Sequence, residues 1–296
     1  MKEKRRTEGR NRASRGLDRL SSAAILRVMN REDAKVARAV GREIPAIARA
    51  VEAIVKSLRA GGRLFYAGAG TSGRLAVLDA AECPPTFGVS PQLVQALIAG
   101  GKRAITGAVE GAEDDAASGA RELKRRKLDA RDVVVGIAAS GGTPFVLGAM
   151  AYAKKRGAAT VAVTANRNSP LARAARICIA AETGPEVIAG STRLKAGTAQ
   201  KLVLNMLSTA ALVRLGHVYD NWMIDVALTN RKLRERGVRI LAEAGGSTSA
   251  AAEKALRQCG NKLRAALVLL KRGGTPAEAR ERLRRAGENL RRALGE

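Results

Sequence analysis

Apolar residues are spaced in three different ways along this chain, and each spacing predicts a different kind of structure. In residues 1–55 they recur at the three- and four-residue intervals of one helix face. In residues 56–235 short apolar runs alternate with helical stretches, and residues 236–296 return to helical spacing. We therefore expect an N-terminal helical segment, an α/β domain and a small C-terminal helical module with these boundaries.

The N-terminal segment is predicted to contain two helices. Ser21 or Ser22 can cap the first, and Asp33 or a neighbour the second, because their side chains accept hydrogen bonds from the free amides at a helix start. Apolar positions recur here at helical intervals: Val36, Val40, Ile44, Ile47, Val51 and Val55.

Five short apolar runs in the middle of the chain predict buried β-strands. They are Leu64–Ala67, Leu93–Ala99, Val133–Ala139, Thr160–Val163 and Ile177–Ala180. Because helical stretches separate them, the fold class is α/β, with a doubly wound parallel sheet flanked by helices. In the C-terminal module, glycine-containing breaks at 245–247 and 273–276 delimit three short helices.

The first strand is followed by the segment GAGTSG (68–73), and a helical pattern resumes at Arg74. Glycines allow a ligand to approach the backbone closely, and the free amides of a helix start attract phosphate. The same letters fit the dinucleotide fingerprint, but the next strand ends in two glycines, without the acidic residue that holds a ribose. We therefore favour a phosphate, and the candidate ligands are Gly70, Thr71, Ser72 and Gly73.

A second strand–loop–helix unit repeats this arrangement. The run that begins at Val133 ends in SGGTP (140–144), where Pro144 suits the first turn of a helix. Glycine and hydroxyl residues are also common in ordinary turns. Two such loops with serine and threonine at the helix start nevertheless favour one phosphorylated ligand, and the second loop adds the candidates Ser140, Gly141 and Thr143.

Two glutamates stand out as candidates for acid–base chemistry. Glu82 ends a helical stretch, where a negative charge is disfavoured, and two prolines restrict the backbone after it. Glu113 lies in the acidic cluster 110–115, whose aspartates have the ordinary role of partners to a helix dipole. A third polar segment, 190–201, opens the longest apolar helix and offers Ser191, Arg193 and Lys195 as contacts to an anionic sugar.

These motifs closely resemble, in order and spacing, those of the N-acetylmuramic acid 6-phosphate etherase family. The likeness extends from Thr7 almost to the C-terminus and rests on TEGRNRAS, GAGTSGRL, DAAECPPTFG, AVEGAEDD, VVVGIAASGGTP and GSTRLKAGTAQKLVLNMLST. The two phosphate loops alone would indicate only the wider sugar-isomerase (SIS) superfamily, to which the glucokinase regulatory protein is related.

The resemblance implies a lyase that releases D-lactate from N-acetylmuramic acid 6-phosphate and leaves N-acetylglucosamine 6-phosphate, in peptidoglycan recycling. By position, Glu82 resembles the family's proton donor to the departing lactate oxygen. Glu113 resembles its second catalytic glutamate, which we assign as the base that removes the C2 proton. The resemblance also implies a homodimer with active sites near the subunit interface, a UBA-like C-terminal module, and no metal or other cofactor.

One position departs from the family pattern. The second loop usually reads SGRTP in this family, whereas Gly142 stands at the arginine position here, so a guanidinium contact is missing. Two alternatives remain on the same fold: a sugar-phosphate sensor without catalysis, and a sugar-phosphate isomerase. Retained ligand binding without turnover in an E82Q variant would favour the etherase over a sensor, and lactate release would exclude the isomerase.

The composition limits the other classes of function. The chain carries a formal charge of +26, but aromatic residues make up only 2% of it, so few side chains could stack on a nucleic acid, and we expect at most adventitious binding. Three scattered cysteines and a single histidine, His217, offer neither a disulfide framework nor a nucleophilic triad, and a reduced cytoplasm fits. The apolar run 202–213 is too short to span a membrane.

Overall fold

The computed structural model describes residues 6–296, which divide into two compact units. One unit comprises the residues up to Ala81 together with Pro91–Ala211, and the other comprises Glu82–Ser90 together with Leu212–Glu296. Helix α3 (Gly70–Phe87) contributes residues to both units. The second unit therefore includes more of the chain than the predicted module at 236–296.

The first unit is built on a five-stranded parallel sheet. Its strands are β1 (Leu64–Gly68), β2 (Val94–Ile98), β3 (Val133–Ile137), β4 (Ala159–Thr164) and β5 (Ile177–Ala180). The strand order is β2-β1-β3-β4-β5, so the winding of the chain reverses between β1 and β3. The five predicted strands and the doubly wound α/β class are confirmed.

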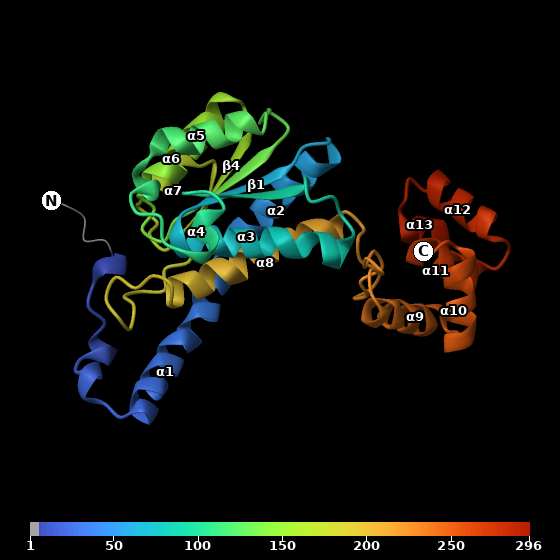
Figure 1. Cartoon of the computed structure of the whole chain (residues 1–296), viewed down its shortest axis with the longest axis horizontal. Helices are drawn as coiled ribbons and strands as arrows, with labels where there is room; N and C mark the ends of the chain where they lie inside the picture. Colours follow the sequence, from blue (N-terminus) through green and yellow to red (C-terminus); the bar gives the residue numbers. More distant parts are fainter. Residues whose placement is uncertain (1–5) are drawn as a thin grey trace. The chain divides into compact units, whose positions relative to one another are not determined.

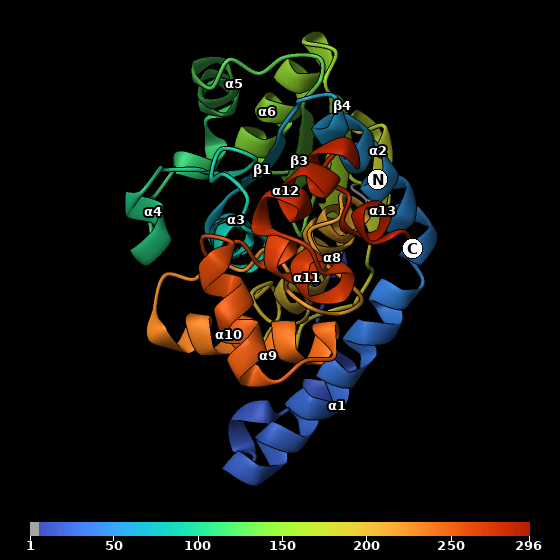
Figure 2. The same ribbon diagram turned by 90° about the vertical axis from the view of Figure 1, so that its right-hand side faces the viewer.

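Helices cover both faces of this sheet (Figures 1 and 2). One face carries α5 (Ala116–Arg125), α6 (Pro144–Lys155) and α7 (Pro170–Ala174), and the other carries α2 (Ile44–Arg59), α3 and α8 (Lys195–Arg214). Strand β1 alternates between them: Phe65 and Ala67 pack in the cluster that contains α6 side chains, whereas the Tyr66 hydroxyl donates to Asp79 of α3 at 2.8 Å. Burial on both faces explains why the strand is apolar throughout.

The N-terminal part begins with three short 3-10 turns and continues into one long helix. The turns are Arg6–Glu8, Arg12–Ser14 and Leu17–Arg19, and helix α1 covers Ser22–Gly41 with the Ser21 hydroxyl accepting from the Ala24 amide at 3.4 Å. The predicted cap at Ser21 is thus confirmed.

The predicted helix start near Asp33 is wrong, because Asp33 lies inside α1 and the second helix, α2, begins at Ile44. The helical structure is interrupted instead beside Glu43. The Glu43 carboxylate accepts from the Ala180 amide at 3.1 Å and forms an ion pair with Arg167. Ile44 at the new helix start is 47% exposed, whereas Ile47 and Val51, which follow at helical intervals, are buried.

The second unit contains five helices among the described residues, rather than the three that the glycine breaks predicted. They are α9 (Arg231–Gly245), α10 (Ser249–Gln258), α11 (Leu263–Arg272), α12 (Pro276–Arg285) and α13 (Leu290–Leu294). Leu241, Leu256 and Leu267 lie at the centre of their common core. The two additional helices arise because the second predicted segment divides into α10 and α11 near Gly260, and the third divides into α12 and α13 near Gly287, where each glycine has a positive φ.

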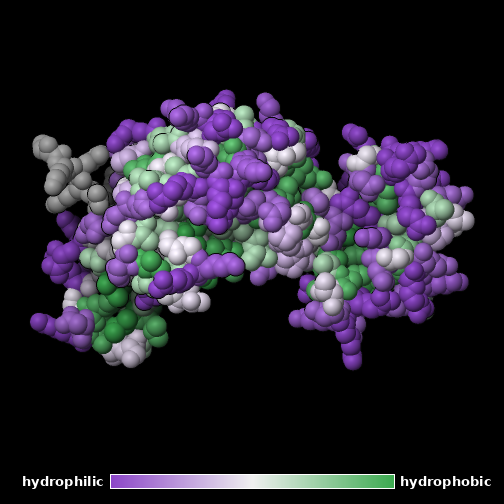
Figure 3. Space-filling model, turned by 45° about the horizontal axis from the view of Figure 1, so that its top comes forward, coloured by the Kyte–Doolittle hydropathy of each residue, from purple (hydrophilic) through white to green (hydrophobic). Residues whose placement is uncertain are grey.

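Hydrophilic side chains dominate the visible surface of these C-terminal helices in Figure 3, as the excess of arginine and lysine requires. Many of the cations are paired locally, for example Arg284 and Arg285 with Glu281 on α12. None of the described helices combines the length and the apolar character needed to cross a bilayer.

Candidate active site

The first of the two predicted phosphate loops, residues 68–73, forms the start of a helix. Helix α3 begins at Gly70, four residues before the predicted start at Arg74, so Thr71, Ser72 and Gly73 all lie in its first turn. Gly70 has a φ of +51°, and a Cβ on Gly73 would come within 2.6 Å of Ile98 Cγ1. The amides of residues 70–72 precede any intrahelical acceptor and remain available to an anion.

The two predicted loops follow adjacent strands. β1 pairs with β3, with Gly68 opposite Ile137, so the chain leaves both strands at the same edge of the sheet. The strand order reverses at this pair, and a crevice forms beyond the carboxyl ends of strands at such a point. The structure therefore brings the residues 70–73 and 140–143 to the place where this fold class binds ligands.

The hydroxyls of the first loop have different surroundings. Thr71 is half-buried, whereas Ser72 is buried and its hydroxyl donates to Oε1 of Gln200 at 2.9 Å. Nε2 of Gln200 is buried and has no hydrogen-bond partner in the described part of the chain. Gln200 was not predicted as a site residue, although its place in the motif KAGTAQK was a signal that could have indicated it.

The second loop is held by its own side chains. The Ser140 hydroxyl accepts from the Gly142 amide at 3.2 Å, and Gly141 has a φ of +70°. A Cβ on Gly141 would come within 2.2 Å of the Ser169 hydroxyl, so glycine is required there. Thr143 precedes α6 without forming a capping hydrogen bond, which leaves its hydroxyl available at the helix start.

The third predicted segment differs from the first two, because a carboxylate of the protein occupies its helix start. Glu186 accepts from the amides of Lys195 and Ala196, each at 2.9 Å. The Lys195 ammonium is buried and contacts Glu32 Oε2 at 2.7 Å. Lys195 thus joins α8 to α1, which is a structural role in place of the predicted contact to substrate.

The other two residues predicted in this segment remain accessible. Ser191 is half-buried and Arg193 is exposed. The segment also lies beside the first loop, because a Cβ on Gly197 would come within 3.4 Å of the Thr71 methyl carbon. The N-terminal motif packs against the chain just before it, where Nδ2 of Asn11 donates to the Pro185 carbonyl at 3.0 Å.

Glu82 lies on the exposed side of α3. The prediction that the helix ends before the prolines is wrong. The helix includes Pro84 and Pro85 and continues to Phe87. This is possible because both prolines occupy the final turn, where only two amide donors are lost from the helix. Cys83 beside Glu82 points inward and is 2% exposed.

Glu113 lies in η4 (Ala112–Asp114), a 3-10 turn between β2 and α5 that follows α4 (Arg103–Thr106). Its side chain is exposed, while Ala112 packs against the same apolar cluster as Ala69 of the first loop. Asp115 caps α5 by accepting from the Ser118 amide at 2.9 Å, and this bond lowers the pKa of Asp115. Asp115 thus has the predicted role of a partner to a helix start.

This chain matches known sequences both as separate domains and over nearly its whole length. The sequence model of the glucokinase regulatory protein N-terminal SIS domain matches residues 46–154, and that of the SIS domain matches residues 114–210. The N-acetylmuramic acid 6-phosphate etherase of Aeromonas hydrophila is 55% identical over 267 residues, 90% of this chain and 90% of that protein. The N-acetylmuramic acid 6-phosphate etherase 2 of Enterococcus faecalis is 52% identical over 264 residues, 89% of each protein. This chain belongs to the N-acetylmuramic acid 6-phosphate etherase family.

The fold of this etherase family member has a counterpart among solved structures. The phosphoheptose isomerase from Francisella tularensis aligns with a TM-score of 0.50 at 18% identity, covering 65% of this chain and 98% of that one. The likeness extends to the fold alone. Within the described residues of the etherase chain, no cluster of three or more His, Cys, Asp or Glu side chains could hold a metal ion.

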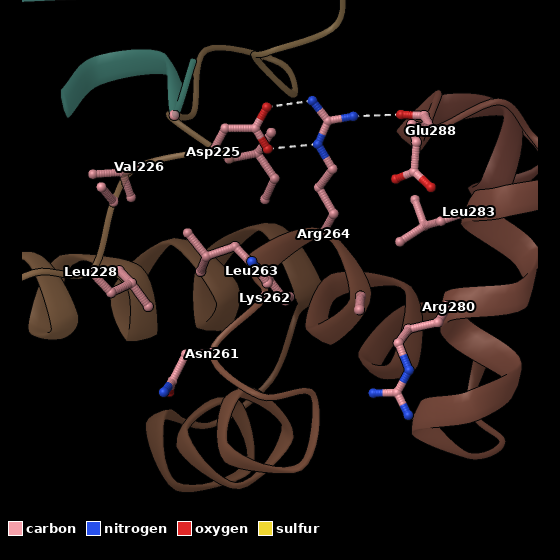
Figure 4. A pocket seen from close by; sticks show the side chains of 14 residues that line it. Asp225, Val226, Leu228, Asn261, Lys262, Leu263, Arg264, Arg280, Leu283 and Glu288 are labelled. Carbon is pink, nitrogen blue, oxygen red and sulfur yellow. Dashed lines mark hydrogen bonds and ion pairs between the residues drawn. The ribbon is translucent and has the colours of Figure 1, made fainter. Parts of the chain in front are cut away.

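The second unit of the etherase chain contains a cavity of about 670 Å³, which Figure 4 shows. Arg264 of α11 crosses it and donates to Asp225 and to the Glu288 carbonyl. His217 Nδ1 lies 2.8 Å from Asp225 Oδ2. Burial alone would raise the pKa of Asp225, but its hydrogen bonds to Arg264 and His217 outweigh this effect and lower the pKa. None of the predicted site residues lines this cavity, and the network fixes the chain after α8 to α11.

Proposed function

We propose that this protein cleaves the D-lactyl ether of N-acetylmuramic acid 6-phosphate, giving N-acetylglucosamine 6-phosphate and D-lactate. It is a carbon–oxygen lyase of peptidoglycan amino-sugar recycling. The observation that carries this proposal is identity of 50–55% to etherases of that name, over about 90% of each chain. A fold-level likeness to isomerases would not distinguish the reaction.

The phosphate of the substrate binds at the paired helix starts. The free amides at the start of α3 and the Thr71 hydroxyl hold one side of it, and the Thr143 hydroxyl at the start of α6 holds the other. Ser72 positions Gln200, whose unpaired Nε2 is an additional donor toward the ligand. Arg193 is an exposed cation in the third motif, which lies beside the first loop, and it contributes a positive charge to the binding of the substrate.

The reaction is an elimination followed by addition of water. In the ring-opened sugar the C2 proton is acidic because it is adjacent to the C1 aldehyde, and Glu113 removes it. The electron pair forms the C2–C3 double bond as the C3–O bond breaks, and Glu82 gives a proton to the departing lactate oxygen. Water then adds to C3 of the unsaturated aldehyde, and the glutamates act in the reverse sense.

The assembly and the location are part of the same proposal. The protein acts as a homodimer in the cytoplasm, where a phosphorylated amino sugar is retained. The residues described here require no metal or other cofactor for this reaction, because the aldehyde already acidifies the C2 proton.

Release of D-lactate tests the proposed function directly. Purified protein is incubated with N-acetylmuramic acid 6-phosphate and, in parallel, with the unphosphorylated sugar. We expect stoichiometric D-lactate from the phosphorylated sugar and much slower release from the other. Binding of the phosphorylated sugar without any lactate would instead indicate a sensor on the same fold, and a sugar isomer without lactate would indicate an isomerase.

A further inference from the structure

A cavity of about 420 Å³ lies in the first unit, and the proposed reaction does not use it. We call it the α1 cavity, because the second half of α1 forms one side of it. Asn11 of the N-terminal motif, the residues 182–185 after β5, and Lys195 complete the wall. The volume is sufficient for a small ligand. No residue of the two phosphate loops lines the α1 cavity, and neither do Glu82 and Glu113, so it does not coincide with the candidate active site.

Cations line the α1 side of this cavity. Lys35, Arg38 and Arg42, which caps the helix, are spaced by three and four positions, so they lie along one side of α1. Lys35 pairs with Glu32, whereas neither arginine forms an ion pair with another described residue. Basic residues at the end of a helix also complement its dipole, but that role does not require them to border a cavity. Like charges four positions apart repel each other, and an anion between the two guanidinium groups removes the repulsion.

The carboxylates in the wall do not neutralise these two arginines. Glu32 accepts from two lysines and from Asn11, so both of its oxygens are already occupied. Glu182 is the other acidic residue of the wall, and it does not pair with either arginine. Four cations and two carboxylates line the α1 cavity, which leaves an excess of two positive charges. The charge of the cavity therefore favours an anionic ligand.

Thr183 belongs to the same wall and adds a neutral donor. Its side chain is buried, and its hydroxyl oxygen has no hydrogen-bond partner in the part of the chain that the structure describes. A buried hydroxyl without a partner is unfavourable, because it has lost its hydrogen bonds to water. An oxygen atom of a ligand in the α1 cavity supplies the missing acceptor.

We propose that the α1 cavity binds a phosphate group, at a site additional to the one formed by the two loops. The phosphate lies between Arg38 and Arg42, because each guanidinium offers parallel N–H donors that match a pair of phosphate oxygens. The Thr183 hydroxyl donates to a further oxygen. Inorganic phosphate and a small phosphomonoester share this chemistry. The inference does not depend on the proposed etherase reaction.

A ligand in the α1 cavity links segments that are distant in sequence. Asn11 already joins the N-terminal motif to the chain after β5, by donating to the Pro185 carbonyl at 3.0 Å. A phosphate held by the two arginines of α1 and by Thr183 adds a second connection at the same place. A ligand that binds only the folded state stabilises it by mass action. We therefore expect phosphate to raise the melting temperature of the protein through this site.

Phosphate binding to variants of α1 tests the proposal. Equilibrium dialysis of the full chain against radiolabelled inorganic phosphate gives the number of ions bound per chain and their affinity. We expect R38Q/R42Q to bind one phosphate fewer per chain than the wild type, because the affinity of the α1 cavity falls by about tenfold or more when its charge-assisted hydrogen bonds are lost. Both side chains are exposed, so the substitutions should leave the fold intact.

The matched control is R27Q/R31Q. It removes two exposed arginines from the same helix at the same spacing, and neither of them lines the α1 cavity. We expect this variant to bind as many phosphate ions as the wild type. Equal reductions in the two variants would show a general effect of charge, and unchanged binding in R38Q/R42Q would restrict phosphate to the loops. Either result would overturn the proposal.

Thermal unfolding gives a second measurement. T183V preserves the shape of the side chain but removes the hydroxyl, so phosphate should raise its melting temperature less than that of the wild type, and still less in R38Q/R42Q. An equal increase in R38Q/R42Q and in the wild type would contradict the site. Dialysis against glycerol 3-phosphate distinguishes the two sources of the phosphate group. Tighter binding than inorganic phosphate, lost in R38Q/R42Q, would identify a phosphomonoester, and weaker binding would identify the free ion.

Discussion

Lys195 and Glu32 form an ion pair in the interior of the first unit, with 2.7 Å between Nζ and Oε2 and side-chain exposures of 1% and 4%. The pair joins the start of α8 to the middle of α1. Asn11 also donates to Glu32, at 2.8 Å, so the N-terminal motif is attached to the same carboxylate. Glu32 therefore joins the N-terminal motif, α1 and the start of α8. The start of α8 in turn lies beside Thr71 of the first loop.

We expect K195M to destabilise the protein by about 3 kcal/mol, because removing one partner of a buried pair leaves the other charge without full compensation. Lys35 and Asn11 remain bonded to Glu32, so the loss should be at the lower end for such pairs. The free energy of unfolding in urea measures it. The matched control is K35M, whose side chain is 61% exposed and which should cost less than about 1 kcal/mol. Equal losses in the two variants would contradict the assignment.

Acidification should weaken the same network. Burial disfavours the charged form of Glu32, but hydrogen bonds from Lys195, Lys35 and Asn11 outweigh it and lower its pKa from 4.5 to about 2. A lowered folded-state pKa contributes stability that is fully present above the unfolded value and is lost as the pH falls toward the folded value. Wild-type stability should therefore decrease by about 3 kcal/mol from this group between about pH 5 and pH 2. Unfolding of E32Q should lack this component, and identical pH slopes in both proteins would refute it.

Replacing Glu82 by glutamine should reduce kcat by about 10²- to 10⁴-fold while KM changes little, because the amide cannot protonate the departing oxygen but preserves the shape of the side chain. E113Q should show a comparable loss. Initial rates of lactate release over a range of substrate concentrations give both constants. E110Q provides the control, since Glu110 is exposed in the same acidic cluster and has no role in the mechanism. A large loss in E110Q would indicate a general electrostatic effect.

Restoring arginine at position 142 should improve binding of the phosphate. Gly142 is not among the glycines with positive φ, so its backbone conformation accepts a side chain. An arginine–phosphate pair with two hydrogen bonds should lower KM for the phosphorylated sugar by about tenfold and leave kcat nearly unchanged. Steady-state kinetics measures the change. An equal gain with the unphosphorylated sugar would show that the arginine acts elsewhere.

The sheet could be predicted from the sequence because strands buried on both faces are continuous apolar runs, as in Val133–Ile137. Helix boundaries were less accurate. The hydroxyl residues Thr71 and Ser72 predict a loop, but α3 already begins at Gly70. Such residues are compatible with the first turn of a helix, where the backbone amides have no intrahelical acceptors. The break between α1 and α2 was missed because it depends on Glu43 meeting Arg167 and the Ala180 amide, which only the folded chain brings together.

The same limit applies to the candidate site. The residues of the two loops were found because glycines and hydroxyls at helix starts have a local chemical meaning. A cation in a polar motif predicts a ligand contact for Lys195, and nothing local indicates that its partner is Glu32, 163 positions earlier. The sequence does not indicate Gln200, because a neutral amide has no distinguishing local pattern and its contact with Ser72 forms only in the folded chain.

The position of Glu186 at the start of α8 limits where an external anion can bind. Its carboxylate already satisfies the first amides of α8, so that helix end is electrically neutralised by the chain itself. Of three glycine- and hydroxyl-rich helix ends in the first unit, only those of α3 and α6 can still accept a phosphate group. This single internal carboxylate therefore leaves the starts of α3 and α6 as the two predicted loops whose free amides are open to an anion.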